Sequence, residues 1–241
     1  MSGHSKWAQI KRKKAVTDAK KGAVFTRFAK NISLAAKNGK DPEMNPALRG
    51  AIDQAKEVNM PKDNIEKAIL KGAGELPGVV YQEEIYEAYG PGGAAILIVC
   101  VTDNTNRTVS NMRSIFTDHG GALGESGSVM YMFTQKGMIC LANEDIAQHN
   151  AEEIELSAIE AGACDIQTEA EGLTIVTAKQ NFHKIFKFLK DKGITPTQAQ
   201  IEWTTEQKTT PAPEYQEKLK TLIAALEDND DVNDVYTNIA W

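Results

Sequence analysis

The fold of this chain is decided by residues 137–177, which read GMICLANEDIAQHNAEEIELSAIEAGACDIQTEAEGLTIVT. The stretch opens with six residues that are typical of a strand, and residues 151–161 repeat apolar side chains with the period of a helix. Residues 165–169 and 173–177 are again extended and flank a turn at Gly172, so they predict a hairpin. The stretch therefore has the order strand, helix, strand, strand.

The residues on either side of this stretch complete one α/β module. Residues 129–133 before it are extended, residues 182–192 after it have a helical period, and residues 197–204 form a last predicted strand. Strand, helix, strand, strand, helix, strand is the order of a ferredoxin-like fold. We therefore expect a ferredoxin-like domain of residues 130–203.

A second α/β set precedes this module. Residues 79–89 and 94–102 are extended and flank Gly90-Pro91-Gly92-Gly93, which predicts a hairpin, and residues 105–119 predict a helix that ends at two glycines. The glycine-rich turn leads into a strand and is not followed by Gly-Lys-Ser or Gly-Lys-Thr. It therefore does not match a phosphate-binding loop.

The C-terminal residues contain a helix and a strand that have no sheet of their own. Residues 214–226 have a helical period, and residues 232–239 are extended. Because the set before the module lacks one helix and one strand, we expect the C-terminal elements to complete it. The prediction is a discontinuous α/β domain of residues 79–129 plus 204–241, into which the ferredoxin-like domain is inserted.

The first part of the chain predicts a small helical domain of residues 1–78. Apolar residues repeat with a helical period over residues 18–38, 46–58 and 61–74, and the glycines and proline of residues 72–78 mark a linker. The expected fold class is therefore α+β with three domains. An N-terminal three-helix domain is followed by two ferredoxin-like α/β domains, the third inserted in the second.

The composition is that of an ordinary globular protein. With 41% hydrophobic and 25% charged residues, a disordered or fibrous chain is excluded. The longest apolar run, residues 94–101, is far too short to span a membrane, and the basic N-terminus lacks the apolar core of a secretory signal. The three cysteines form no Cys-x-x-Cys pair, which favours a reducing compartment. We expect a cytoplasmic protein with no membrane partner, metal or cofactor.

The formal net charge of −6 conceals a strong asymmetry along the chain. Residues 1–72 hold 16 basic and 7 acidic residues, whereas residues 73–241 hold 11 basic and 26 acidic ones. In the first forty residues, eleven lysines and arginines accompany a single acid, Asp18. Such a segment neutralises phosphate groups and releases their counterions. The asymmetry therefore favours a first domain that binds nucleic acid.

The basic side chains continue onto the first predicted helix. Phe25, Phe28, Ile32 and Ala36 share one face of this helix, and its basic residues lie opposite. For Trp7 two alternatives stay open: its indole stacks on a base, or it anchors the basic segment on the helical domain. The residues expected to contact phosphate are Lys6, Lys11, Arg12, Lys13, Lys14, Lys20, Lys21, Arg27 and Lys30.

Catalytic patterns are weak in this sequence. Gly124-Glu125-Ser126-Gly127-Ser128 misses a Gly-x-Ser-x-Gly nucleophile elbow by one position and precedes a strand, which favours a surface turn. Residues 129–133 are apolar on both faces of their predicted strand, which argues against an RNA-binding sheet. An enzyme or a small-ligand sensor at the glycine-rich loops, dependent on Arg107 or Ser126, is the least favoured alternative.

Several motifs together resemble the YebC/PmpR family, and the resemblance spans nearly the whole chain. It implies a three-domain, cytoplasmic bacterial protein that is not an enzyme and whose relatives are transcriptional regulators that bind DNA. The family also includes a mitochondrial translational activator of a cytochrome oxidase subunit, and its bacterial members are linked to the ribosome and to relief of stalling at proline-rich stretches. The motifs are Gly3-His4-Ser5-Lys6-Trp7, Ile10-Lys11-Arg12-Lys13-Lys14, Asp18-Ala19-Lys20-Lys21-Gly22, Pro61-Lys62-Asp63-Asn64-Ile65, Tyr89-Gly90-Pro91-Gly92-Gly93, Thr102-Asp103-Asn104-Thr105-Asn106-Arg107-Thr108 and Gly121-Ala122-Leu123-Gly124-Glu125-Ser126-Gly127-Ser128-Val129.

The expected partner of the basic domain is therefore DNA. The alternative partner is ribosomal RNA, bound in the ribosome. Reading a DNA sequence needs side chains that reach base edges. The outward face of the first helix offers mainly lysine, with Arg27 and Asn31 or Asn38 as candidate readers. This composition slightly favours an RNA surface.

Overall fold

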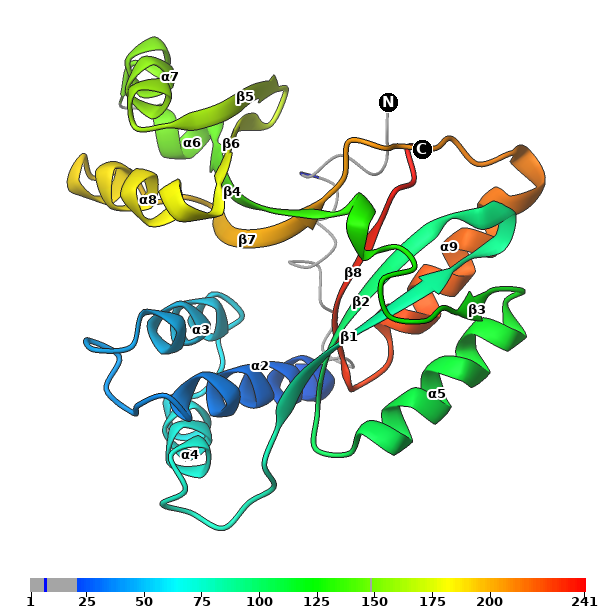
Figure 1. The fold of residues 1–241 in the computed structure, drawn as a ribbon. Helices are drawn as coiled ribbons and strands as arrows, with labels where there is room; N and C mark the ends of the chain where they lie inside the picture. Colours follow the sequence, from blue (N-terminus) through cyan, green and yellow to red (C-terminus); the bar gives the residue numbers. More distant parts are fainter. Residues whose placement is uncertain (1–6, 8–20, 148) are drawn as a thin grey trace. The chain divides into compact units, whose positions relative to one another are not determined.

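The computed structural model describes residues 7, 21–147 and 149–241, which form a group of N-terminal helices and two four-stranded antiparallel sheets (Figure 1). The α+β fold class predicted from the sequence is confirmed. The described residues divide into two compact units. One contains residues 21–130 and 208–241, and the other contains Trp7 and residues 131–207.

Within the described residues, three helices of the N-terminal domain enclose an apolar core. Ile32, Leu48 and Ile65, one from each helix, are buried in this core, and Phe25 and Phe28 pack against it. The apolar face predicted for the first helix is therefore confirmed, although residues 18–20 of that prediction lie outside the described residues. The helices are α2 (Lys21–Ala36), α3 (Pro46–Glu57) and α4 (Lys62–Gly72).

The first sheet has the strand order β3-β1-β2-β8, with α5 and α9 packed on one face. β8 pairs antiparallel with β2, where Ile98 lies opposite Val235, so the C-terminal strand completes this sheet and the intervening domain is inserted, as the sequence predicted. Every residue of β2 is buried, and α2 contacts this strand as well. The elements are β1 (Gln82–Tyr89), β2 (Ala95–Thr102), α5 (Thr105–Asp118), β3 (Ala122–Leu123), α9 (Pro213–Glu227) and β8 (Val232–Thr237).

The strand order of this sheet is that of a ferredoxin-like domain with one change in connectivity. β1 takes the place of the third strand although it comes first in the chain. The predicted hairpin joins it to β2 through the short 3₁₀ turn η2 (Pro91–Gly93), in which the Gly93 amide donates to the Gly90 carbonyl oxygen at 3.0 Å.

The second sheet has the order β5-β6-β4-β7, the ferredoxin-like order with regular connectivity. Ile139, Leu141 and Ile175 point from the sheet toward α7 and α8, where Ile154 and Ile185 join the same buried core. The elements are β4 (Thr134–Ala142), the single turn α6 (Asn143–Ile146), α7 (Ala151–Glu160), β5 (Ala163–Glu169), β6 (Gly172–Ala178), the 3₁₀ turn η4 (Lys179–Asn181), α8 (Phe182–Asp191) and β7 (Gln198–Thr204).

The predicted strand over residues 129–133 is wrong. Met130–Met132 form the 3₁₀ turn η3, and the first strand of the inserted domain begins only at Thr134. Tyr131 is 72% exposed, so this stretch is not buried on both sides. The reason is the carboxylate of Glu87, which accepts the amides of Val129 and Met130 and turns the chain before the sheet starts. None of the described helices is long and apolar enough to cross a membrane.

Candidate nucleic-acid interface

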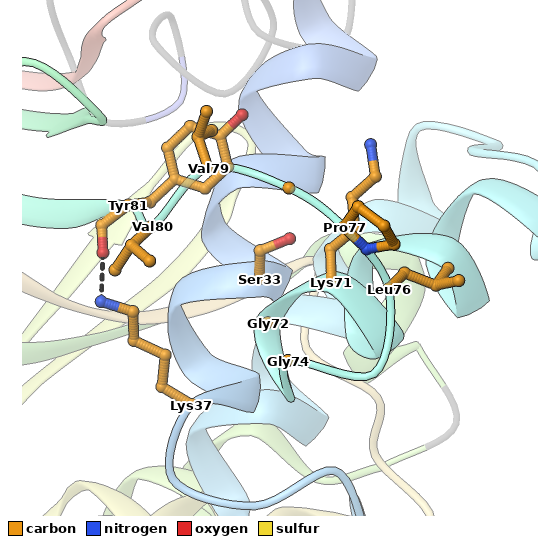
Figure 2. A pocket seen from close by; sticks show the side chains of 11 residues that line it. Ser33, Lys37, Lys71, Gly72, Gly74, Leu76, Pro77, Val79, Val80 and Tyr81 are labelled. Carbon is orange, nitrogen blue, oxygen red and sulfur yellow. Dashed lines mark hydrogen bonds between the residues drawn. The ribbon is translucent and has the colours of Figure 1, made fainter.

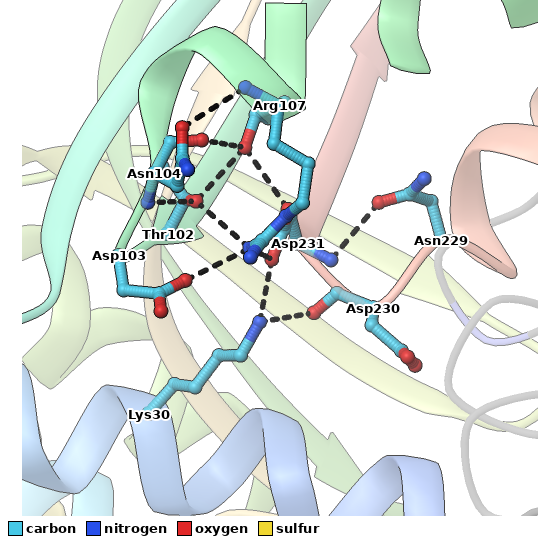
Figure 3. A network of polar contacts seen from close by, with 9 residues as sticks. Lys30, Thr102, Asp103, Asn104, Arg107, Asn229, Asp230 and Asp231 are labelled. Carbon is cyan, nitrogen blue, oxygen red and sulfur yellow. Dashed lines mark hydrogen bonds and ion pairs between the residues drawn. The ribbon is translucent and has the colours of Figure 1, made fainter. Parts of the chain in front are cut away.

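The outward face of α2 meets an acidic segment from the far end of the chain. Residues 227–234, the acidic segment, read EDNDDVND and run from the last residue of α9 into the start of β8. Lys30 on α2 is buried against it, with Nζ 2.7 Å from Oδ1 of Asp231 and 2.8 Å from the carbonyl oxygen of Asp230 (Figure 3). A lysine of the predicted phosphate-binding face is therefore neutralised inside the protein.

Two further side chains of α2 are occupied in the same way. The Arg27 guanidinium donates to the carbonyl oxygen of Glu227 at 2.7 Å, and Nδ2 of Asn31 donates to Oδ1 of Asn233 at 2.7 Å. These are two of the three side chains proposed as base readers. Each side chain has one such hydrogen bond, while Nε of Arg27 and Oδ1 of Asn31 are buried with no hydrogen-bond partner among the described residues.

Asp231 is the centre of a buried polar network that joins three elements. Besides Lys30, its carboxylate accepts hydrogen bonds from the Arg107 guanidinium at 3.0 and 3.1 Å and from the Thr108 hydroxyl at 2.9 Å. The side chain of Asp231 is 5% exposed and that of Lys30 is 9% exposed. Burial raises the pKa of Asp231, but the hydrogen bonds from Lys30, Arg107 and Thr108 outweigh it, so its pKa lies below the ordinary value.

The start of α5 holds Arg107 in this position. Asn104 caps the helix, because its side chain accepts the Arg107 amide at 3.1 Å. The guanidinium also bonds Asp103 at 2.8 Å. In the ligand-sensor alternative Arg107 binds a small molecule, but here its guanidinium is held by two aspartates.

Trp7 is buried against the second sheet. Its side chain is 4% exposed and packs against Cys140 and Ala142, on the face of the second sheet opposite α7 and α8. Gly172 makes room for it, since a Cβ there would lie 2.9 Å from Cζ2 of the indole. In this structure Trp7 anchors on the inserted domain. Its contact with nucleic acid stays a prediction.

This burial predicts how Trp7 fluorescence responds to nucleic acid. In a variant with Trp203→Phe and Trp241→Phe, only Trp7 emits. Stacking on a base would quench the indole, whereas a side chain packed in the protein is shielded. We expect little acrylamide quenching and no change in emission when RNA or DNA is added to saturation. Strong quenching by either polymer would instead support the stacking alternative.

The glycine-rich loop after β3 is closed around an internal carboxylate. Glu87, on β1, is 6% exposed and accepts the amides of Gly127 at 2.6 Å and of Val129 and Met130 at 2.7 Å each. A set of converging backbone amides is what an anionic ligand needs. Here the protein's own glutamate fills it. Ser126 lies exposed on this loop, which fits the predicted surface turn.

A cavity of about 260 Å³ lies under the linker between α4 and β1 (Figure 2). Its walls include Lys37 and Lys71 together with apolar residues of the linker such as Val79 and Val80. The ammonium group of Lys37 donates to the carbonyl oxygen of Tyr81. No acidic or histidine side chain is among the residues that line it, all of which the structure describes.

Comparison with known proteins covers both parts of the fold. A model of the TACO1/YebC protein N-terminal domain matches residues 5–75, and a model of the TACO1/YebC second and third domain matches residues 81–239. The chain belongs to the TACO1/YebC family. The three-domain architecture read from the topology is therefore the one that the family models describe.

Relatives of the TACO1/YebC family match over the full length of the chain. A "probable transcriptional regulatory protein" of Dictyoglomus thermophilum is 47% identical over 239 residues, which are 99% of this chain and 95% of the relative. A protein of the same description from Geobacillus thermodenitrificans is 46% identical, with 99% and 97% covered. The crystal structure of a conserved hypothetical protein from Aquifex aeolicus superposes with a TM-score of 0.86 at 43% identity, covering 98% of this chain and 97% of that one.

The predicted phosphate contacts of this TACO1/YebC member fall into two groups. Arg27 and Lys30 are bonded to the acidic segment, where Lys30 is buried, and their contact with phosphate stays a prediction. Asn38, the third candidate reader, is exposed. The other group consists of Lys6, Lys11, Arg12, Lys13, Lys14, Lys20 and Lys21. Its members lie outside the described residues, except that Lys21 begins α2, and nothing is described of the Lys21 side chain.

Proposed function

We propose that this TACO1/YebC-family chain is a non-enzymatic, cytoplasmic regulator of gene expression that binds nucleic acid through its basic N-terminal segment, residues 6–21. One observation carries the proposal. The segment holds seven lysines and arginines and one acid, while the remaining chain holds 20 basic and 32 acidic residues. A local excess of positive charge on an acidic protein is suited to phosphate contacts.

The descriptions of the relatives as transcriptional regulatory proteins support DNA as the target. A specific observation favours RNA, and ribosomal RNA in particular, as the second candidate. Arg27 and Asn31 are already bonded to the acidic segment, so α2 keeps few side chains that can read base edges. Binding through lysines to a phosphate backbone suits a folded RNA recognised by its shape. Crosslinking in cells, followed by sequencing of the recovered DNA and RNA, distinguishes promoter fragments from ribosomal RNA.

Charge reversal in the basic segment tests the proposal directly. Replacing Lys11, Arg12, Lys13 and Lys14 with glutamate is expected to weaken binding and to lower the slope of log K against log[salt] by about 3–4, at about 0.7–0.9 per phosphate contact. The measurement is fluorescence anisotropy of labelled RNA and of labelled duplex DNA over a salt series.

The control variant changes one arginine and three lysines that are exposed in the discontinuous α/β domain, Arg113, Lys208, Lys218 and Lys220, also to glutamate. It has the same total charge as the first variant and is expected to keep most of the affinity and the wild-type slope. Equal affinities and slopes for the two variants would refute binding through residues 6–21.

A further inference from the structure

The charge of the ferredoxin-like unit is unevenly distributed. Residues 131–207 hold six lysines and twelve acidic residues, yet five of the six lysines lie within residues 179–192, where Asp191 is the single acid. Four glutamates lie on α7, so the two helices on the same face of the sheet carry opposite charges. α8 is thus a basic element in an acidic domain.

The lysines of α8 are gathered on its outward face. Phe182, Ile185 and Leu189 are buried in the core of the domain, and Lys184, Lys187 and Lys190 are exposed on the opposite side. The three recur every third residue, so they follow one another along about 9 Å of helix. They therefore present a row of ammonium groups to solvent.

Internal contacts do not account for this row. Within the described residues, neither Lys184 nor Lys187 has an ion-pair partner, in contrast to Lys192, which bonds Glu153 at 3.3 Å, and Lys136, which bonds Glu206 at 3.1 Å. Lys190 lies in the last turn, where a positive charge stabilises a helix, with Nζ 5.0 Å from the centre of the Phe186 ring.

Helix stability does not account for Lys184 either. It occupies the first turn of α8, and a positive charge at that end opposes the helix dipole. The acidic first turn of α7, with Glu152 and Glu153, shows the favourable arrangement in the same domain. The row is therefore better explained by an external anionic partner than by folding.

We propose that the outward face of α8 is a second docking surface for RNA, which it binds through the phosphate backbone. The sequence of α8, FHKIFKFLKD, has no arginine, asparagine or glutamine, so it has few side chains that read base edges and offers mainly ammonium groups, which position phosphates. Trp7, which belongs to the basic segment proposed above, lies on the opposite face of the same sheet, so α8 offers a separate surface.

The proposal rests on the proposed function but uses a different surface, so the two can fail separately. A second set of contacts on the same chain raises affinity, because the first contact increases the effective concentration of RNA at the second.

The test replaces Lys184, Lys187 and Lys190 with glutamine in the full chain. We expect the affinity for a fluorescein-labelled RNA hairpin to fall by about tenfold or more at low salt, and the salt slope to fall by about 2–3, since each phosphate contact contributes about 0.7–0.9. Substitution of the same three lysines by arginine keeps the charge and is expected to keep the binding. Circular dichroism and thermal unfolding check that each variant is folded.

The matched control replaces Lys208, Lys218 and Lys220 with glutamine, and it is expected to bind as the wild type. If the α8 variant binds RNA like this control while charge reversal at residues 11–14 weakens binding, the second surface is refuted and the proposed function stands. If neither variant weakens binding, both proposals fail. A loss of affinity for duplex DNA that exceeds the loss for RNA would overturn the choice of RNA as the partner.

Discussion

Replacing Asp231 with alanine is expected to lower the free energy of unfolding by about 3–5 kcal/mol. The substitution removes the carboxylate that neutralises Lys30, and it leaves a buried ammonium group without its counter-charge. The Thr108 hydroxyl loses an acceptor at the same time. The measurement is urea unfolding followed by circular dichroism, with the unit of residues 21–130 and 208–241 as the part most affected.

A second variant separates the loss of the pair from the burial of an unpaired charge. Lys30→Met combined with Asp231→Leu replaces both partners by apolar side chains of similar size, and such replacements are often neutral. Arg107 is 46% exposed and can turn to water. We expect the double variant to recover most of the stability lost by Asp231→Ala.

An exposed ion pair provides the control for this prediction. Lys40 and Glu75 form a pair whose side chains are 58% and 46% exposed, so Glu75→Ala is expected to cost no more than about 1 kcal/mol. If Asp231→Ala also lowered the free energy of unfolding by no more than about 1 kcal/mol, the buried network would contribute no more to stability than an exposed ion pair. The acidic segment would then hold α2 by shape alone.

The low pKa of Asp231 also sets a dependence on pH. Its ordinary pKa is 3.8, and the folded protein holds it lower, so the unfolded chain takes up the proton first as the pH falls. The stabilisation is therefore complete above about pH 4 and is lost as the pH falls through the pKa of the folded state. We expect the unfolding free energy of Asp231→Ala to fall less steeply below pH 4 than that of the wild type.

The parts of the fold that sequence predicted well are those with local signals. The short runs of apolar and β-branched residues at 137–142 and 173–177 and the helical periods after them are properties of neighbouring residues, and each element formed as expected. The insertion was predicted by counting secondary-structure elements, since residues 79–128 lack one helix and one strand of an α/β domain. In the structure β8 supplies the missing strand by pairing with β2.

The contacts on the polar face of α2 could not be predicted from local sequence patterns. The helical period identified its apolar face correctly, but the partner of its other face comes about 200 residues later in the chain. A signal was present in the sequence, because five of the eight residues in the acidic segment are acidic. A basic segment and an acidic segment far apart in the chain predict an internal contact as readily as a nucleic-acid surface. The interpretation of Lys30 as a phosphate ligand did not consider the internal contact.

The turn at residues 130–132 shows a tertiary contact overriding a local preference. Residues 129–133 are a short apolar run typical of a strand, yet Val129 and Phe133 are buried on either side of a 3₁₀ turn. The amides that a strand would pair with a neighbour are bonded to the Glu87 carboxylate instead. Glu87 lies more than forty residues earlier, so nothing within residues 129–133 reveals this partner.

Replacing Glu87 with alanine is expected to lower the unfolding free energy by about 3 kcal/mol. Three amides lose their acceptor, and an unpaired buried donor costs about 1–3 kcal/mol. The amides of Gly127 and Met130 are less deeply buried than that of Val129, and water can reach them, so the total stays near the lower end. Glu84→Ala on the same strand removes a carboxylate from a more exposed position and is expected to change stability by less than about 1 kcal/mol.

The variant Glu87→Gln tests whether the negative charge itself holds the loop. Burial raises the pKa of Glu87, but the hydrogen bonds from Gly127, Val129 and Met130 lower it by more than that. The pKa therefore lies below its ordinary value, and the folded state favours the carboxylate. Glutamine keeps one acceptor oxygen and places an amide group against donors. We therefore expect faster hydrogen exchange at the amides of Val129 and Met130 in this variant, with the inserted sheet still protected. Exchange as slow as in the wild type would show that shape and one acceptor are enough, and that the carboxylate is not what bends the chain before β4.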